Sequence, residues 1–210
     1  MSGPDASAPL REWSDALARR SATPAGGSAA AIAASLAASL VAMVGGLTAS
    51  RASYAETRPE SEAAAERGEV LRRRLLALAE EDAQTFQDVL DALALPRTSE
   101  EAISRRNAVR DDALKAAAAV QYELLLLAGE TVDLAESLVH RGLRSAVGDA
   151  GAALFLAAAG ARAAYWAIRS NLRRLHDDPE AERMADAALE RLELIEGAET
   201  RVRMRLAQQL

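Results

Sequence analysis

The run SAAAIAASLAASLVAMVGGL, residues 28–47, contains neither a charged residue nor a proline. Alanine is the best helix former, and the larger residues, with Ile32, Leu36 and Leu40 among them, recur every three or four positions. This pattern predicts a helix whose small faces let neighbouring backbones come close. We therefore expect it to be central and surrounded by other helices.

The remainder of the chain carries the same helical signal. Half of its 210 residues are hydrophobic but only 3% are aromatic, and 12 glycines and 6 prolines interrupt it. The sequence predicts an all-α protein, an elongated antiparallel bundle of about six helices, with residues 1–210 forming a single domain. The expected helices span 8–20, 28–47, 59–93, 99–140, a fifth ending near 175, and 180–206. The fourth is long enough to require a kink or an elongated bundle.

Three helix starts have capping signals. Ser28 follows two glycines, and Thr98 with Glu101 has the spacing of a capping box. Asp178 precedes Pro179, which suits the first position of a helix. Each is expected to begin the helix that follows it.

Composition excludes several classes of protein. The net charge of −6 gives no basic footprint for nucleic acid, and the absence of cysteine excludes disulfides and thiolate metal sites. The N-terminus does not resemble a signal peptide, so a cytoplasmic location is expected. Residues 29–47 are long enough to be considered as a membrane span, but a buried helix is favoured, and no membrane partner is expected. His140 and His176 match no metal-binding signature, so no metal site is predicted.

Two features near the N-terminal half could carry chemistry. Gly26 and Gly27 permit close approach of a ligand, and Ser28 opens a helix whose free N–H groups suit an anion or a carbonyl. Asp82 interrupts an apolar stripe of the third helix at a core position. It is either a general acid/base or ligand acceptor, or the partner of a buried arginine such as Arg106. The glycine corner is equally compatible with a plain tight turn.

Three further polar residues have both structural and functional interpretations. Arg106 lies on an apolar face and would bind a substrate carboxylate or pair within the fold. Asp149 is either an N-cap or part of a functional site. Asn171 either binds a ligand or satisfies the polar groups of a helix end. An unbroken helix between these two would separate them by about 33 Å, so one small ligand would not reach both in one chain. They would serve different sites, or the helix breaks, or a second subunit supplies one of them.

The order of several segments resembles the cyclodeaminase/cyclohydrolase family of folate enzymes. TPAGGSAAAIAASLAASLVAMVGGLT is similar to the family's Gly-rich corner and Ala-rich helix. The family's later segments follow in the same order: DAQTFQDVLDALALP, an arginine matched by Arg106, VGDAGAAL and NLRRLHD. The resemblance covers nearly the whole chain. Five positions depart from the family's pattern: Ala25, Gln121, Leu143, Gly148 and Ala167.

The resemblance implies an all-helical homodimer that acts on a tetrahydrofolate derivative without a metal or redox cofactor. The implied reaction is hydrolysis of methenyl-tetrahydrofolate to formyl-tetrahydrofolate, favoured because no formiminotransferase domain accompanies the chain. The alternatives are a formimino-tetrahydrofolate cyclodeaminase that releases ammonia, and a non-catalytic helical paralogue.

The implied catalytic residues are Asp82 and Asp149, both expected among aliphatic neighbours. The implied substrate-binding residues are Gly26, Gly27, Ser28, Arg106 and Asn171.

Overall fold

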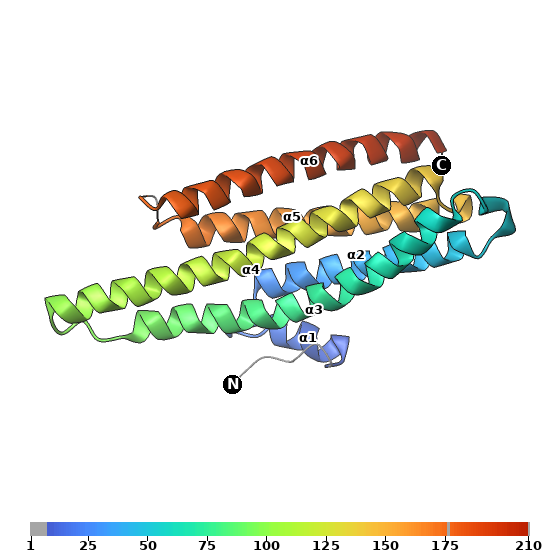
Figure 1. The fold of residues 1–210 in the computed structure, drawn as a ribbon. Coiled ribbons are helices and arrows are strands. Elements are labelled where there is room, and N and C mark those ends of the chain that lie inside the picture. Colours follow the sequence, from blue (N-terminus) through green and yellow to red (C-terminus); the bar gives the residue numbers. More distant parts are fainter. Residues whose placement is uncertain (1–7, 176, 210) are drawn as a thin grey trace.

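The computed structural model of the chain describes residues 8–175 and 177–209, and these contain helices but no strand, which confirms the predicted all-α class (Figure 1). The helices are α1 (Leu10–Leu17), α2 (Gly26–Ala49), α3 (Arg58–Ala94), α4 (Glu100–Arg141), α5 (Val147–Leu172) and α6 (Pro179–Gln209). Two short 3₁₀ turns, Ala52–Tyr54 and Arg144–Ala146, precede α3 and α5.

The five long helices α2 to α6 lie side by side and form an elongated bundle (Figure 1). The fourth expected helix is one continuous helix of 42 residues, so the bundle is long and this helix is not interrupted. The hairpin of α3 and α4 extends beyond the other helices at one end, while the short helix α1 lies outside the bundle (Figure 1).

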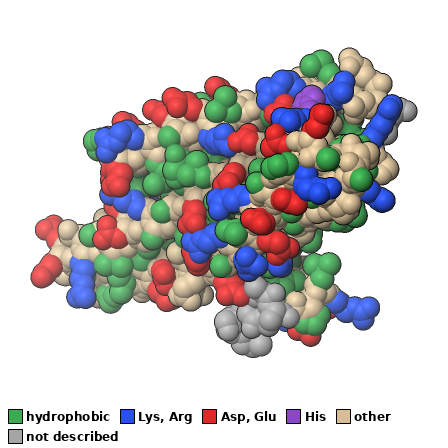
Figure 2. Space-filling view, turned by 45° about the vertical axis from the view of Figure 1, so that its right-hand side comes forward, with side chains coloured by type: hydrophobic (Ala, Val, Ile, Leu, Met, Phe, Trp, Pro, Cys, Tyr) green, Lys and Arg blue, Asp and Glu red, His purple; other side chains and the backbone are tan. Residues whose placement is uncertain are grey.

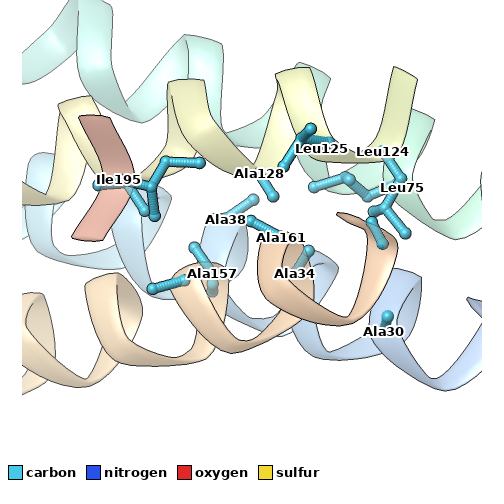
Figure 3. Close-up of a cluster of buried hydrophobic side chains, with 14 of the residues drawn as sticks. Ala30, Ala34, Ala38, Leu75, Leu124, Leu125, Ala128, Ala157, Ala161 and Ile195 are labelled. Atoms are coloured by element: carbon cyan, nitrogen blue, oxygen red, sulfur yellow. The ribbon is translucent and has the colours of Figure 1, made fainter. Parts of the chain in front are cut away.

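Small residues bring the central helices together. The buried faces of α2 and α5 consist mainly of alanine, and Gly160 of α5 lies so close to α2 that a Cβ there would be 2.9 Å from the Ala30 carbonyl oxygen. Larger aliphatic side chains of α3, α4 and α6 complete this core. Figure 3 shows the two kinds in one core cluster, with Ala30, Ala34, Ala38, Ala128, Ala157 and Ala161 as the small side chains and Leu75, Leu124, Leu125 and Ile195 as the large ones.

The expectation that α2 is surrounded on all sides is wrong. Its large residues Leu36, Met43 and Leu47 are 50%, 41% and 40% exposed. Close contact with α3 and α5 is made by the alanine faces, so these three bulky side chains are left on the outer side of the helix. We call Leu36, Met43 and Leu47 the outer α2 stripe.

Two segments, Gly26–Ala49 and Arg144–Leu172, are long and apolar enough to cross a membrane by length and composition alone. In the bundle, 50% and 56% of their most apolar windows are buried. Both therefore have the character of core helices packed against their neighbours.

Ion pairs join the outer faces of the helices, as the high arginine content suggests. Arg67 of α3 binds Glu130 of α4 through two hydrogen bonds of 2.6 and 2.7 Å. Arg201 of α6 binds Glu136 of α4 in the same manner. Figure 2 shows acidic and basic side chains interspersed over one face of the molecule.

The helix starts agree only in part with the capping predictions. Asp178 does cap α6, since its Oδ1 accepts a hydrogen bond of 2.9 Å from the Glu180 N–H. At α4 the cap is Ser99, one residue after the predicted Thr98. At α2 the N-cap is Ala25, so the prediction that Ser28 caps this helix is wrong. Ser28 lies inside the first turn.

Candidate active site

Three helices contribute polar side chains to one cluster in the bundle. Ser28 of α2 donates a hydrogen bond from Oγ to Oδ2 of Asp82 at 2.8 Å. Gln121 of α4 donates from Nε2 to the other carboxylate oxygen, Oδ1, at 2.5 Å. Both carboxylate oxygens of Asp82 are therefore held by neutral donors. We call Ser28, Asp82 and Gln121 the central polar cluster.

The cluster combines deep burial with partial access. Ser28 is fully buried and Gln121 is 1% exposed, while Asp82 is half-buried in the middle of α3. The predicted stripe of α3 explains this position, because Leu78 and Val89 on the same stripe are buried in the core. An acidic group at the edge of an apolar interior interacts more strongly with charge than it would in water.

Gly27 is required by the geometry of this cluster. A Cβ at this position would collide with Asp82 Oδ1 and Gln121 Nε2, and would lie 2.7 Å from Asp82 Cγ. Gly26, by contrast, is exposed, and a Cβ added there would have no atom within 4 Å. The glycine pair therefore has one member against the carboxylate and one facing open space.

The start of α2 also shapes the electrostatics of the cluster. The first hydrogen bond of the helix joins the Ala29 N–H to the Ala25 carbonyl, so the preceding N–H groups of the first turn have no partner within the helix. This positive helix end favours a negatively charged group nearby. A ligand that binds beside the carboxylate would best carry positive charge.

Gln121 was not among the predicted site residues. In the sequence it is visible as a departure from the family's pattern. The spacing on α4 is a further signal, because Gln121 lies three residues before Leu124 and four after Ala117, both buried on α4. A polar residue at that spacing predicts a buried hydrogen-bonding group.

Arg106 is not the partner of Asp82. Its Nε and Nη2 donate to the Leu93 carbonyl oxygen at 3.2 and 3.0 Å, which satisfies the C-terminal end of α3. Burial lowers the pKa of the Arg106 guanidinium, and repulsion from three neighbouring arginines lowers it further. Arg106 therefore lies in a basic environment at the end of the α3–α4 hairpin, away from the central polar cluster.

Asp149 and Asn171 lie at opposite ends of α5. The helix is unbroken from Val147 to Leu172, which removes the alternative that it breaks between them. Asp149 is exposed in its first turn, so the expectation that it is enclosed by aliphatic neighbours is wrong for this chain. Asn171 is half-buried in the last turn. Neither residue belongs to the central polar cluster of the same chain.

No metal centre is evident in the part of the chain that is described. Residues 8–175 and 177–209 contain no group of three or more histidine, aspartate or glutamate side chains that could hold an ion. His176, one of the two histidines, lies outside the described residues.

Comparison with known proteins agrees with the family resemblance of the sequence segments. The profile of the formiminotransferase-cyclodeaminase family matches residues 9–190. Methenyltetrahydrofolate cyclohydrolase of Methylorubrum extorquens is 36% identical over 188 residues, which are 90% of this chain and 87% of that protein. Formimidoyltransferase-cyclodeaminase of Mus musculus is 30% identical over 84% of this chain, which spans 33% of the mouse protein.

A solved structure has the same fold. The crystal structure of formiminotetrahydrofolate cyclodeaminase from Thermotoga maritima matches with a TM-score of 0.80 and 26% sequence identity. The match covers 97% of this chain and 96% of that one.

Proposed function

Because the chain belongs to the formiminotransferase-cyclodeaminase family, we propose that it is an enzyme of one-carbon metabolism that hydrolyses methenyl-tetrahydrofolate to formyl-tetrahydrofolate. The observation that carries the proposal is the central polar cluster. Asp82 is held by Ser28 and Gln121, forms no ion pair with any described residue, and lies directly against Gly27.

The charge of the substrate suits this site. The methenyl bridge carries a delocalised positive charge between two nitrogens, and a half-buried carboxylate stabilises a cation placed beside it. Gly27 lets the start of α2 pack directly against the carboxylate, and the first-turn N–H groups of α2 have no partner within the helix, so they would bind carbonyl groups of the pteridine. Gly26 faces the open side of this corner.

The reaction balances with one group that accepts and returns a proton. Water adds to the methenyl carbon and gives a proton to Asp82, which leaves a tetrahedral carbon between the two nitrogens. One carbon–nitrogen bond then breaks, the leaving nitrogen takes a proton, and the hydroxyl loses its own as the formyl C=O forms. The cation becomes neutral, so one proton is released to solvent. Asp82 serves as general base and then as general acid.

A second reaction is favoured by the solved relative. The Thermotoga maritima protein is a formiminotetrahydrofolate cyclodeaminase and matches over nearly its whole length. Ring closure of a formimino group with loss of ammonia also passes through a tetrahedral carbon between two nitrogens, so the same carboxylate would serve both. We favour hydrolysis because the sequence identity to the cyclohydrolase is higher than that to the cyclodeaminase.

The test follows the absorbance of methenyl-tetrahydrofolate against its spontaneous hydrolysis, with ammonia release from formimino-tetrahydrofolate measured in parallel. Asp82→Asn is expected to lower kcat by about 10²- to 10⁴-fold, the usual worth of a general acid/base, with an unchanged helical circular dichroism spectrum. Full activity in the variant would remove Asp82 from the mechanism. A parent protein that binds folate but turns over neither substrate would instead be a non-catalytic paralogue.

We also propose that the enzyme is a homodimer in which a second copy covers the outer α2 stripe. Three large apolar side chains on one helix face are exposed to solvent in the single chain. In addition, the continuous α5 keeps Asp149 and Asn171 about 33 Å apart, so a ligand that meets both needs two subunits. The catalytic role of Asp149 is proposed on this basis.

Other properties stay predictions from the sequence. These are the cytoplasmic location, the absence of a metal or redox cofactor, and the absence of nucleic-acid or membrane partners. Two substrate contacts also stay predictions: Arg106 binds a substrate carboxylate, and Asn171 binds the substrate. The guanidinium of Arg106 would then bind that carboxylate in addition to the Leu93 carbonyl oxygen.

A further inference from the structure

Only one of the two polar atoms of the Gln121 side chain has a hydrogen-bond partner among the described residues. Its Nε2 donates to Asp82 Oδ1, but its Oε1 is buried and has no hydrogen-bond partner among the described residues. A buried acceptor without a donor destabilises a fold, and such groups are rare in proteins. Packing alone does not account for this residue, because an apolar side chain of similar length would fill the same space without an unpaired oxygen.

The orientation of the amide explains which atom is left unpaired. Only the NH₂ group of Gln121 can approach an ionised carboxylate favourably, so its oxygen is turned away from Asp82. Ser28 donates to the other carboxylate oxygen. The two contacts fix the rotation of the carboxylate plane, and Gly27 packs directly against it.

The neutrality of both partners has a chemical consequence. A lysine or arginine in place of Gln121 would hold Asp82 ionised and neutralise the charge that a cationic substrate needs. A hydroxyl and an amide instead orient the carboxylate without placing a cationic side chain against it. Both groups also contain a donor and an acceptor, so they remain compatible with Asp82 after it has taken up a proton.

Resting on the proposed function, we propose that Gln121 is a positioning residue that orients Asp82 for proton transfer, at the cost of an unpaired buried oxygen. Gln121 does not touch the substrate. It acts through Asp82, and its loss changes the rate of the chemical step more than the binding of substrate.

The test replaces Gln121 with a side chain of similar length but without an amide. In Gln121→Met, kcat is expected to fall about 10- to 100-fold while KM stays within about twofold, since misplacing a catalytic group affects chemistry first. The melting temperature is expected to equal or exceed that of the parent, because the unpaired oxygen is removed. A structural glutamine would give the opposite pattern, with lower stability and unchanged kcat.

Thr131→Val is the matched control. Thr131 is buried on the same helix, its Oγ1 donates only to the Leu127 carbonyl, and it lies outside the central polar cluster. Its replacement is expected to leave kcat at the parental value. A similar loss of kcat in both variants would overturn the inference, because the effect would then be general to α4.

The remaining outcomes are also decisive. Gln121→Leu is made alongside, and failure of both apolar variants to fold would overturn the inference, which expects no loss of stability. Parental kcat in a folded Gln121→Met protein would also overturn it while leaving the proposed hydrolysis intact. A parent protein without turnover would overturn both.

Discussion

Asp82 has only neutral hydrogen-bond partners, although the chain has many arginines. Most of the arginines that form ion pairs do so on the outer faces of the helices, where both charges remain partly exposed. At the central polar cluster, Ser28 and Gln121 hold the carboxylate instead. This division leaves Asp82 without a cationic side chain among the described residues at the edge of the core, where a cation would interact with it more strongly than in water.

The sequence located Asp82 but could not choose its partner. Its position followed from the spacing of the α3 stripe, which is a local property. Gln121 is 39 residues away and belongs to another helix. Which side chain meets Asp82 depends on the relative shift of α3 and α4, and helix periodicity does not determine that shift.

Replacement of Gly27 by alanine tests the close approach at the cluster. The added Cβ would push apart Asp82 and Gln121, so we expect at least a tenfold loss of kcat/KM. Gly46→Ala, in the same helix and with no atom within 4 Å of the added carbon, is the control. It should keep full activity and gain about 0.5–1 kcal/mol of stability in urea unfolding, because alanine favours the helix. Equal activity of the two variants would contradict the role of Gly27.

At the scale of the elements, α2, α3 and α4 are held in register by different interactions. Alanine faces set the short distance between α2 and its neighbours, whereas ion pairs join α3 and α4 outside the core. Arg74 of α3 binds both Glu81 of its own helix and Glu123 of α4, with 2.6 and 2.7 Å to the two oxygens of Glu123. This pair lies close in sequence to the Asp82 and Gln121 positions and supports their alignment.

Acid is expected to weaken this contact. Hydrogen bonds from Arg74 lower the pKa of Glu123 below its ordinary value of 4.5. A carboxyl whose pKa is lower in the folded state stabilises the fold above about pH 4.5, and this contribution is lost as the pH falls through the folded-state pKa. Both side chains are partly exposed, so the effect is modest.

Urea unfolding of the parent and of Arg74→Met measures the contribution. Between about pH 7 and pH 3, the parent should lose more unfolding free energy than the variant, because only the parent has the pair to lose. Arg58→Met, at an exposed arginine of the same helix without an ion pair to any described residue, should behave as the parent does. Equal losses in all three proteins would show that the pair does not stabilise the fold.

At the scale of the whole molecule, the proposed homodimer concerns the exposed apolar face of α2 and the proposed catalytic residue Asp149. The outer α2 stripe is exposed, and Asp149 lies at the end of α5 opposite to Asn171. The homodimer proposed above accounts for both, since a second copy would cover the stripe and bring one chain's Asp149 to another chain's site.

Mixing two inactive variants tests this arrangement. Asp82→Asn and Asp149→Asn chains are each expected to be inactive alone, but random mixing should restore about a quarter of the parental activity. Half of the dimers would then be mixed, each with one site that has both aspartates intact. Adding Leu36→Glu to both chains, which places a charge on the outer α2 stripe, should prevent the recovery. No recovery in the mixture, with dimers confirmed by light scattering, would show that the two aspartates do not share a site across subunits.

Local patterns in the sequence determined the all-α class, the helix positions to within a few residues, the Asp178 cap and the place of Asp82. They did so because periodicity and capping act over one or two helical turns. Only the tertiary structure decided that Ser28 and Gln121 bind Asp82, that Arg106 caps α3, and that Leu36, Met43 and Leu47 of α2 face outward. These outcomes depend on which helix faces meet and at what shift, and that is set by packing between segments far apart in the chain.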